Sequence, residues 1–159
     1  MFVWLKLIHV IAVIVFVGNI TVGIFWKVIA DRSRDPRIMA HTIRGIVGAD
    51  RVFTIPAILV LVAAGVATAL VEQIPILGTG WVLWAIILFV IAGLAFIPVS
   101  RAQHELQAVA DEGATSGTLD ETRYETISAR WNFWGMVALI FPLGAVALMV
   151  LKPSLPGFH

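Results

Sequence analysis

His9 is the residue whose type and position most clearly allow chemistry, because it lies within a long apolar segment near the N-terminus. A neutral imidazole binds haem iron and exchanges hydrogen bonds, so His9 is a candidate metal ligand to haem iron, or a contact to a porphyrin or a quinone. The alternative is a histidine near the membrane interface that bonds to a backbone carbonyl or a lipid headgroup. Residue type and position leave both interpretations open.

A haem held by two histidines would need a second imidazole at the depth of His9, and the sequence places none there. Met149, near the end of the last apolar segment, is the candidate second cofactor-binding residue, and a vacant or water-filled position is equally allowed. His41 and His104 could face each other, beside Glu105, as a metal or proton-handling site, or could lie solvated on polar helices. The fourth histidine is His159.

Five further polar residues lie inside or at the ends of the apolar segments, where polar groups are costly and therefore candidates for function. They are Asn19, Asp50, Arg51, Arg130 and Asn132. A mid-membrane amide such as Asn19 often bonds a neighbouring helix, which favours packing over transport. Asp50 is expected to form an ion pair with Arg51 or Arg130 at the inner mouth of the bundle, with a substrate-anion site as the alternative.

The composition excludes several classes of protein. The chain has 159 residues, of which 60% are hydrophobic and 13% charged, so a lipid bilayer must act as part of its solvent. It has no cysteine, which excludes disulfides and thiolate chemistry, and its net charge of +1 gives no sign of nucleic-acid binding. We find no phosphate-binding glycine loop, nucleophile elbow or intramembrane carboxylate pair.

Four apolar segments are long enough to cross a bilayer, which takes about 20 residues. Because backbone amides cannot stay unpaired in lipid, each segment is predicted to be an α-helix. The fold class is therefore all-α, an integral membrane four-helix bundle that forms a single domain over residues 1–159. The predicted spans cover residues 2–29, 52–71, 80–99 and 131–151.

The basic residues predict the orientation of the bundle. Nine of the eleven lie in the two long connections, and Lys6 and Lys152 lie on the opposite side. Since basic residues favour the cytoplasmic face, both termini are predicted to lie outside the cytoplasm. The nine are Lys27, Arg32, Arg34, Arg37, Arg44, Arg51, Arg101, Arg123 and Arg130.

The cytoplasmic connections are predicted to extend helices two, three and four beyond the membrane. Asp35 followed by Pro36 is typical of a helix N-cap. Residues 100–111 should continue helix three, residues 112–117 form a turn, and residues 118–121 form a capping box that opens helix four. The basic first connection and the acidic second one should pair electrostatically.

The segment Trp4-Leu-Lys-Leu-Ile-His9 resembles small bacterial four-helix membrane proteins whose first helix carries a tryptophan, a lysine and a histidine. These include the HemJ-type protoporphyrinogen oxidases and CopD-type membrane domains, and the chain also looks like a bacterial family of predicted integral membrane proteins of unknown function. The resemblance implies that His9 matches the histidine with which HemJ-like proteins hold haem. Those enzymes also use a lysine in helix three, and residues 81–99 hold none.

Two functions follow as hypotheses. The first is a haem b-binding, redox-linked protein of the bacterial inner (plasma) membrane, which exchanges electrons with a quinone or another complex. The second is a cofactor-free accessory or structural subunit of a larger membrane complex. Lipids are the expected partners in both, with a homo-oligomer or a larger membrane complex as further assemblies.

Overall fold

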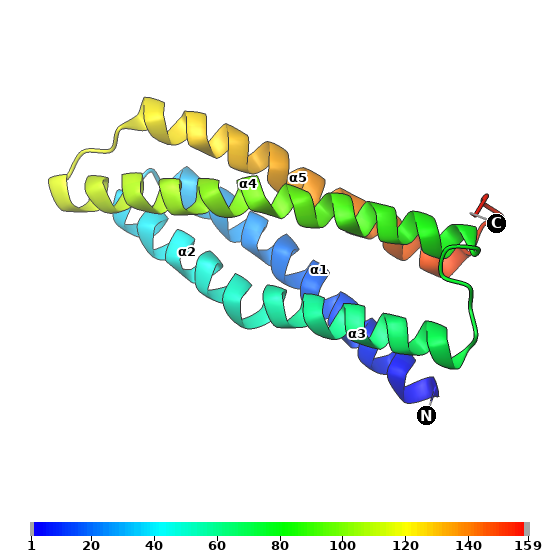
Figure 1. Cartoon of the computed structure of the whole chain (residues 1–159). Coiled ribbons are helices and arrows are strands. Elements are labelled where there is room, and N and C mark those ends of the chain that lie inside the picture. Colours follow the sequence, from blue (N-terminus) through cyan, green and yellow to red (C-terminus); the bar gives the residue numbers. More distant parts are fainter. Residues whose placement is uncertain (1, 158–159) are drawn as a thin grey trace.

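The computed structural model describes residues 2–157, which form long helices joined by short connections (Figure 1). No strand occurs in this part of the chain, so the predicted all-α class is confirmed. The elements in chain order are α1 (Phe2–Ser33), α2 (Pro36–Ala49), the π-helical segment η1 (Asp50–Thr54), α3 (Ile55–Val71), α4 (Gly80–Ser116) and α5 (Glu121–Leu151).

The structure has four helical segments that are long and apolar enough to cross a membrane, with α2, η1 and α3 joined into one of them. Large apolar side chains on these segments face outward, such as Leu59, Leu94 and Val150, which are 67%, 62% and 74% exposed. Side chains of this kind suit a hydrocarbon solvent. The segments are Val3–Ser33, Pro36–Val71, Gly80–Ser116 and Glu121–Leu151.

The start of α1 and the end of α5 lie at the same end of the bundle, and the α1–α2 and α4–α5 connections lie at the other (Figure 1). An even number of membrane passes has this consequence. Which end faces the cytoplasm stays a prediction from the basic residues. The end with the α1–α2 and α4–α5 connections is the predicted cytoplasmic end, and the end with the termini is the predicted outer end.

The helices pack as two pairs. α1 packs against α3, α4 packs against α5, and α2 joins the pairs through its contacts with α4. Across the described residues, α3 approaches neither α4 nor α5 to within 8 Å between Cα atoms, and α1 does not approach α4 that closely. The two pairs are therefore held together mainly at the cytoplasmic end.

The largest buried apolar cluster lies at that cytoplasmic end. It includes Met39 and Ile43 of α2, Leu106 and Val109 of α4, and Ile127 of α5, all at most 7% exposed. Where helices leave the bilayer, water is the solvent and the burial of apolar surface stabilises their association. Inside lipid this driving force is absent, which accounts for the position of the cluster.

The predicted helical extensions exist, but some of their boundaries differ. Asp35 caps α2 as expected, because its Oδ1 accepts a hydrogen bond from the backbone amide of Arg37 at 2.8 Å. The predicted end of helix three at residue 111 was wrong, since α4 continues to Ser116. The predicted capping box was also wrong: Asp120, not Thr118, caps α5 through the backbone amide of Arg123.

Ion pairs join the two connections, as the charge pattern predicted. Arg44 of α2 lies 3.3 Å from Asp111 of α4, and Arg34 lies 4.0 Å from Glu121 of α5. These side chains are exposed, so each pair stabilises the fold by at most about 1 kcal/mol. Together the two ion pairs help to fix which faces of the α1–α3 and α4–α5 helix pairs meet.

Candidate functional site

Asp50 lies where the second membrane segment changes from an α-helix to a π-helix. In η1 the amide of Ile55 bonds the carbonyl of Asp50, five residues back rather than four. The wider turn directly precedes Pro56, whose ring would crowd the carbonyl four residues before it in a regular α-helix. Single π-helical turns occur frequently at functional sites, and this one places Asp50 toward the bundle interior, 7% exposed.

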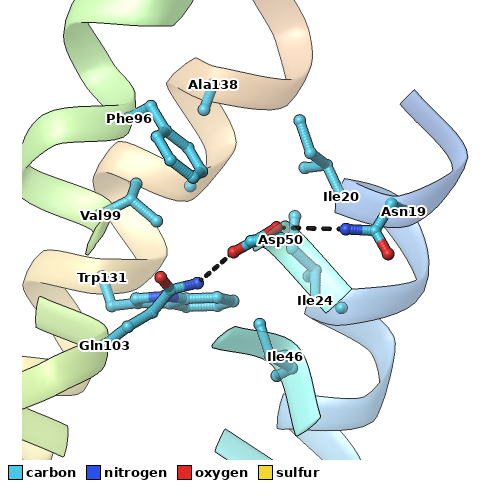
Figure 2. Close-up of a pocket in the computed structure, with 12 residues that line it drawn as sticks. Asn19, Ile20, Ile24, Ile46, Asp50, Phe96, Val99, Gln103, Trp131 and Ala138 are labelled. Carbon is cyan, nitrogen blue, oxygen red and sulfur yellow. Dashed lines mark hydrogen bonds between the residues drawn. The ribbon is translucent and has the colours of Figure 1, made fainter. Parts of the chain in front are cut away.

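Four polar side chains from three segments form what we call the Asp50 cluster: Asn19, Asp50, Thr54 and Gln103. Figure 2 shows Asp50 between Asn19 of α1 and Gln103 of α4. Asp50 Oδ1 accepts hydrogen bonds from Asn19 Nδ2 at 3.1 Å and Thr54 Oγ1 at 2.8 Å. Asp50 Oδ2 accepts one from Gln103 Nε2 at 2.9 Å. The donors to the Asp50 carboxylate are thus two side-chain amides and a hydroxyl, all of which are neutral.

A cavity of about 30 Å³ adjoins the Asp50 cluster. Asn19, Asp50 and Gln103 line it together with apolar residues and Trp131 of α5 (Figure 2). A volume of about 10–15 Å³ accommodates one water molecule. Trp131 is 4% exposed, and its buried Nε1 has no hydrogen-bond partner among the described residues. The cavity is therefore lined mostly by apolar atoms, but the Asp50 cluster borders it and it is large enough for a water molecule.

A second polar group, which we call the Lys27 cluster, joins α1 to α5 on the cytoplasmic side: Lys27, Asp31, Tyr124 and Ser128. Lys27 is only 1% exposed, and its Nζ donates to Asp31 Oδ2 at 2.5 Å and Ser128 Oγ at 2.6 Å. Tyr124 donates its hydroxyl proton to Asp31 Oδ1 at 2.7 Å. Nζ also lies 5.2 Å from the ring centroid of Trp131, so this indole lies against Lys27 and also lines the cavity beside the Asp50 cluster.

His9 lies half-buried against α3. Its Nδ1 is 2.9 Å from the carbonyl oxygen of Leu61, and a carbonyl can only accept a hydrogen bond. Nδ1 therefore carries the proton, which leaves the lone pair of a neutral ring on Nε2. Gly65 makes room for the ring, because a Cβ at that position would lie 3.0 Å from His9 Cε1.

Replacement of Gly65 by alanine is expected to displace the imidazole and destabilise the α1–α3 pair by about 1–3 kcal/mol, because the added Cβ overpacks the contact. Gly93→Ala is the matched control, since a Cβ at Gly93 meets nothing within 4 Å. Both changes gain the same helix propensity. Thermal unfolding in detergent measures the difference, and equal midpoints for the two variants would contradict the packing of His9 on Gly65.

The other predicted ligands lie apart from His9. Met149 is half-buried on α5, in the helix pair opposite to the one that holds His9. His41 on α2 and His104 on α4 are both exposed, and His159 lies outside the described residues. Over residues 2–157 no group of three or more His, Cys, Asp or Glu side chains could hold a metal ion.

The ion pair expected for Asp50 was wrong. Arg51 is exposed, and Arg130 pairs with Glu105 of α4, while the carboxylate of Asp50 is bonded by amides and a hydroxyl. Asn19 does bond a neighbouring helix, as predicted from its amide in a mid-membrane position. Asn132 is exposed at the start of the fourth span.

Lys27 and Gln103 belong to these clusters but were not among the residues predicted from the sequence. Lys27 counts toward the charge asymmetry, which hides that it is buried, although its apolar neighbours Trp26, Val28 and Ile29 were a signal. Gln103 lies between Val99 and Leu106 on the apolar stripe of α4, with spacings of four and three residues that mark one helix face. Thr54, Tyr124 and Ser128 gave no comparable signal.

Residues 3–153 match the family described as predicted integral membrane protein (DUF2269). No curated protein matches the chain, and no solved structure matches it. Because the match covers nearly the whole sequence and the structure has four helical segments able to cross a membrane, the chain is a multi-pass integral membrane protein. It belongs to this family.

Proposed function

We propose that this member of the DUF2269 family of predicted integral membrane proteins binds a haem b through Nε2 of His9 and takes part in electron transfer. The observation that carries the proposal is the 2.9 Å contact of His9 Nδ1 with the Leu61 carbonyl. Metal-ligating histidines typically donate their other ring nitrogen in this way, which fixes the tautomer and the orientation of the ring. The contact with the Leu61 carbonyl is what a purely structural histidine would make, and it is also what a histidine that binds iron through Nε2 would make.

An aromatic pair on the side of α1 that carries His9 supports the proposal. Phe16 lies two helical turns further along the same side of α1, and its ring meets that of Phe89 on α4 at a centroid distance of 5.8 Å. A flat apolar macrocycle needs apolar walls of this kind. The chain's part is to hold the iron at a fixed imidazole and to exclude water with these aromatic side chains.

A bound haem supplies a one-electron iron couple, whose potential depends on the axial ligands and on burial. His9 would hold the iron, and Met149 is left out of the proposal because it belongs to the opposite helix pair. With the predicted orientation, His9 lies in the outer half of the bacterial inner membrane. A quinone or a neighbouring membrane complex is the proposed electron partner.

Replacement of His9 by alanine is expected to remove haem from the protein, because it deletes the only protein ligand proposed for the iron. The haem content per chain is measured as the pyridine haemochrome of protein purified from haem-replete cells. His41→Ala is the matched control, since His41 is an exposed histidine on the cytoplasmic extension. Wild type and control should carry near-stoichiometric haem.

An equal haem content in wild type and His9→Ala would refute His9 as the ligand. Haem-free wild type would favour the alternative of a cofactor-free accessory subunit. A mild-detergent purification would then be expected to recover partner proteins together with the chain.

A further inference from the structure

We propose that Asp50 is a proton-exchange site, whose carboxyl group takes up and releases a proton through water held between it and Trp131. Nothing in this proposal depends on haem binding at His9. It rests on the Asp50 cluster, the cavity beside it and the unpartnered Nε1 of Trp131.

The cavity favours water over other occupants. Asn19, Thr54 and Gln103 all direct hydrogen-bond donors at Asp50, and Trp131 adds an N–H that has no protein acceptor in the described chain. A water molecule can accept from Trp131 and donate to the carboxylate of Asp50. A metal cation would meet these donors instead of oxygen ligands, and about 30 Å³ is too small for an organic substrate.

No charged side chain is bonded to Asp50 in the described residues. The charged groups on the elements around it have other partners or lie at the surface. Lys27 of α1 bonds Asp31, and Arg44 of α2 pairs with Asp111. Arg51 of η1 is exposed, and Glu105 of α4 pairs with Arg130 of α5. His104, which directly follows Gln103 on α4, is exposed. Neutral hydrogen-bond donors and water alone must therefore accommodate both protonation states of Asp50.

The proton enters from the cytoplasmic side and returns to it. On that side of Trp131 the Lys27 cluster continues as far as Asp31, whose side chain is 29% exposed. On the other side of Asn19, α1 is apolar until His9, with Ala12 and Phe16 buried at 4% and 5% exposure. Protonation forms an O–H bond on Asp50 with a proton from cytoplasmic water, and deprotonation returns that proton to the same water.

The test is infrared difference spectroscopy of the full chain in lipid nanodiscs, between acidic and alkaline pH, with the aspartate carboxyls labelled with ¹³C. A buried protonated aspartate gives a carbonyl stretch that shifts with the label and in D₂O. We expect this band to appear on acidification and to be lost in Asp50→Asn. Asp111→Asn, which changes an exposed aspartate, should leave it in place.

Trp131→Phe keeps an aromatic ring and removes the N–H, so it should shift the frequency of the band and the pH at which it appears. If Asp50→Asn does not fold, Gln103→Leu leaves the carboxyl and removes one donor, and it must shift the labelled band in frequency. The absence of any band that depends on Asp50 or Gln103 would overturn the proposal. So would a spectral change that follows sodium concentration at constant pH, which would indicate a cation site.

Discussion

Asp31→Ala is expected to destabilise the folded protein by about 3–5 kcal/mol, because it leaves the buried ammonium group of Lys27 without its counter-ion. Asp31 bonds Lys27 within α1 and Tyr124 of α5, and the contact with Tyr124 holds α1 against α5. In the variant, Lys27 would keep, among residues 2–157, only the hydroxyl of Ser128 and the faces of two aromatic rings. Thermal or chemical unfolding in detergent measures the loss.

Asp111→Ala is the matched control for this prediction, since it removes an exposed carboxylate whose partner Arg44 is also exposed. It should cost at most about 1 kcal/mol. Adding Lys27→Met to Asp31→Ala should restore much of the stability, because it removes the unpaired buried charge. Equal losses for Asp31→Ala and Asp111→Ala would show that the Lys27 cluster does not stabilise the bundle.

Trp131→Ala is expected to cost about 3–5 kcal/mol, the range for truncating a large buried aromatic side chain. Trp131 is 4% exposed and belongs to the buried apolar cluster at the cytoplasmic end. Its loss leaves a cavity next to the Asp50 cluster and removes the cation–π contact with Lys27. The unfolding midpoint in detergent should fall accordingly.

Two variants serve as controls for Trp131→Ala. Trp131→Phe should cost less than half as much, because it keeps most of the ring and its lost N–H has no protein acceptor in the described residues. Trp84→Ala changes a tryptophan that is 42% exposed and should have a small effect. A loss at Trp84 as large as that at Trp131 would contradict the placement of the core at the cytoplasmic end.

The four spans and their helical extensions could be predicted because they depend on quantities that a sequence carries directly. Apolar length determines whether a helix can cross a bilayer, and Asp35-Pro36 is a local helix-start signal. The end of α4 was misplaced because Gly113 was interpreted as a turn. In the structure it allows close packing instead, since a Cβ there would lie 3.1–3.2 Å from atoms of Leu119 and Pro36.

The partners of Asp50 could not be predicted, for a geometric reason. The π-helical turn at residues 50–54 inserts a residue into the helical register, so a regular helical wheel fails to place Asp50 relative to α3. Which neighbouring helix meets Asp50 depends on how the two helix pairs meet. That arrangement is set by the buried cluster of Met39, Leu106 and Ile127, whose pairing a single sequence does not specify.

The role of His9 could be predicted from the sequence only in part. Its residue type and its position in a membrane helix pointed to ligand chemistry, and the carbonyl partner was one of the two interpretations left open. Only the structure identifies that partner as Leu61 and shows that the contact uses Nδ1, which leaves Nε2 for a metal. The sequence could also not show that Met149 belongs to the other helix pair.

The visible absorption spectrum of the purified wild-type protein is the direct test of haem binding at His9. The protein should be expressed in haem-replete cells and purified in mild detergent, with a spectrum recorded before and after reduction. We predict a Soret band that shifts on reduction and is absent from the His9→Ala variant. A colourless, folded wild-type preparation would contradict haem binding at His9.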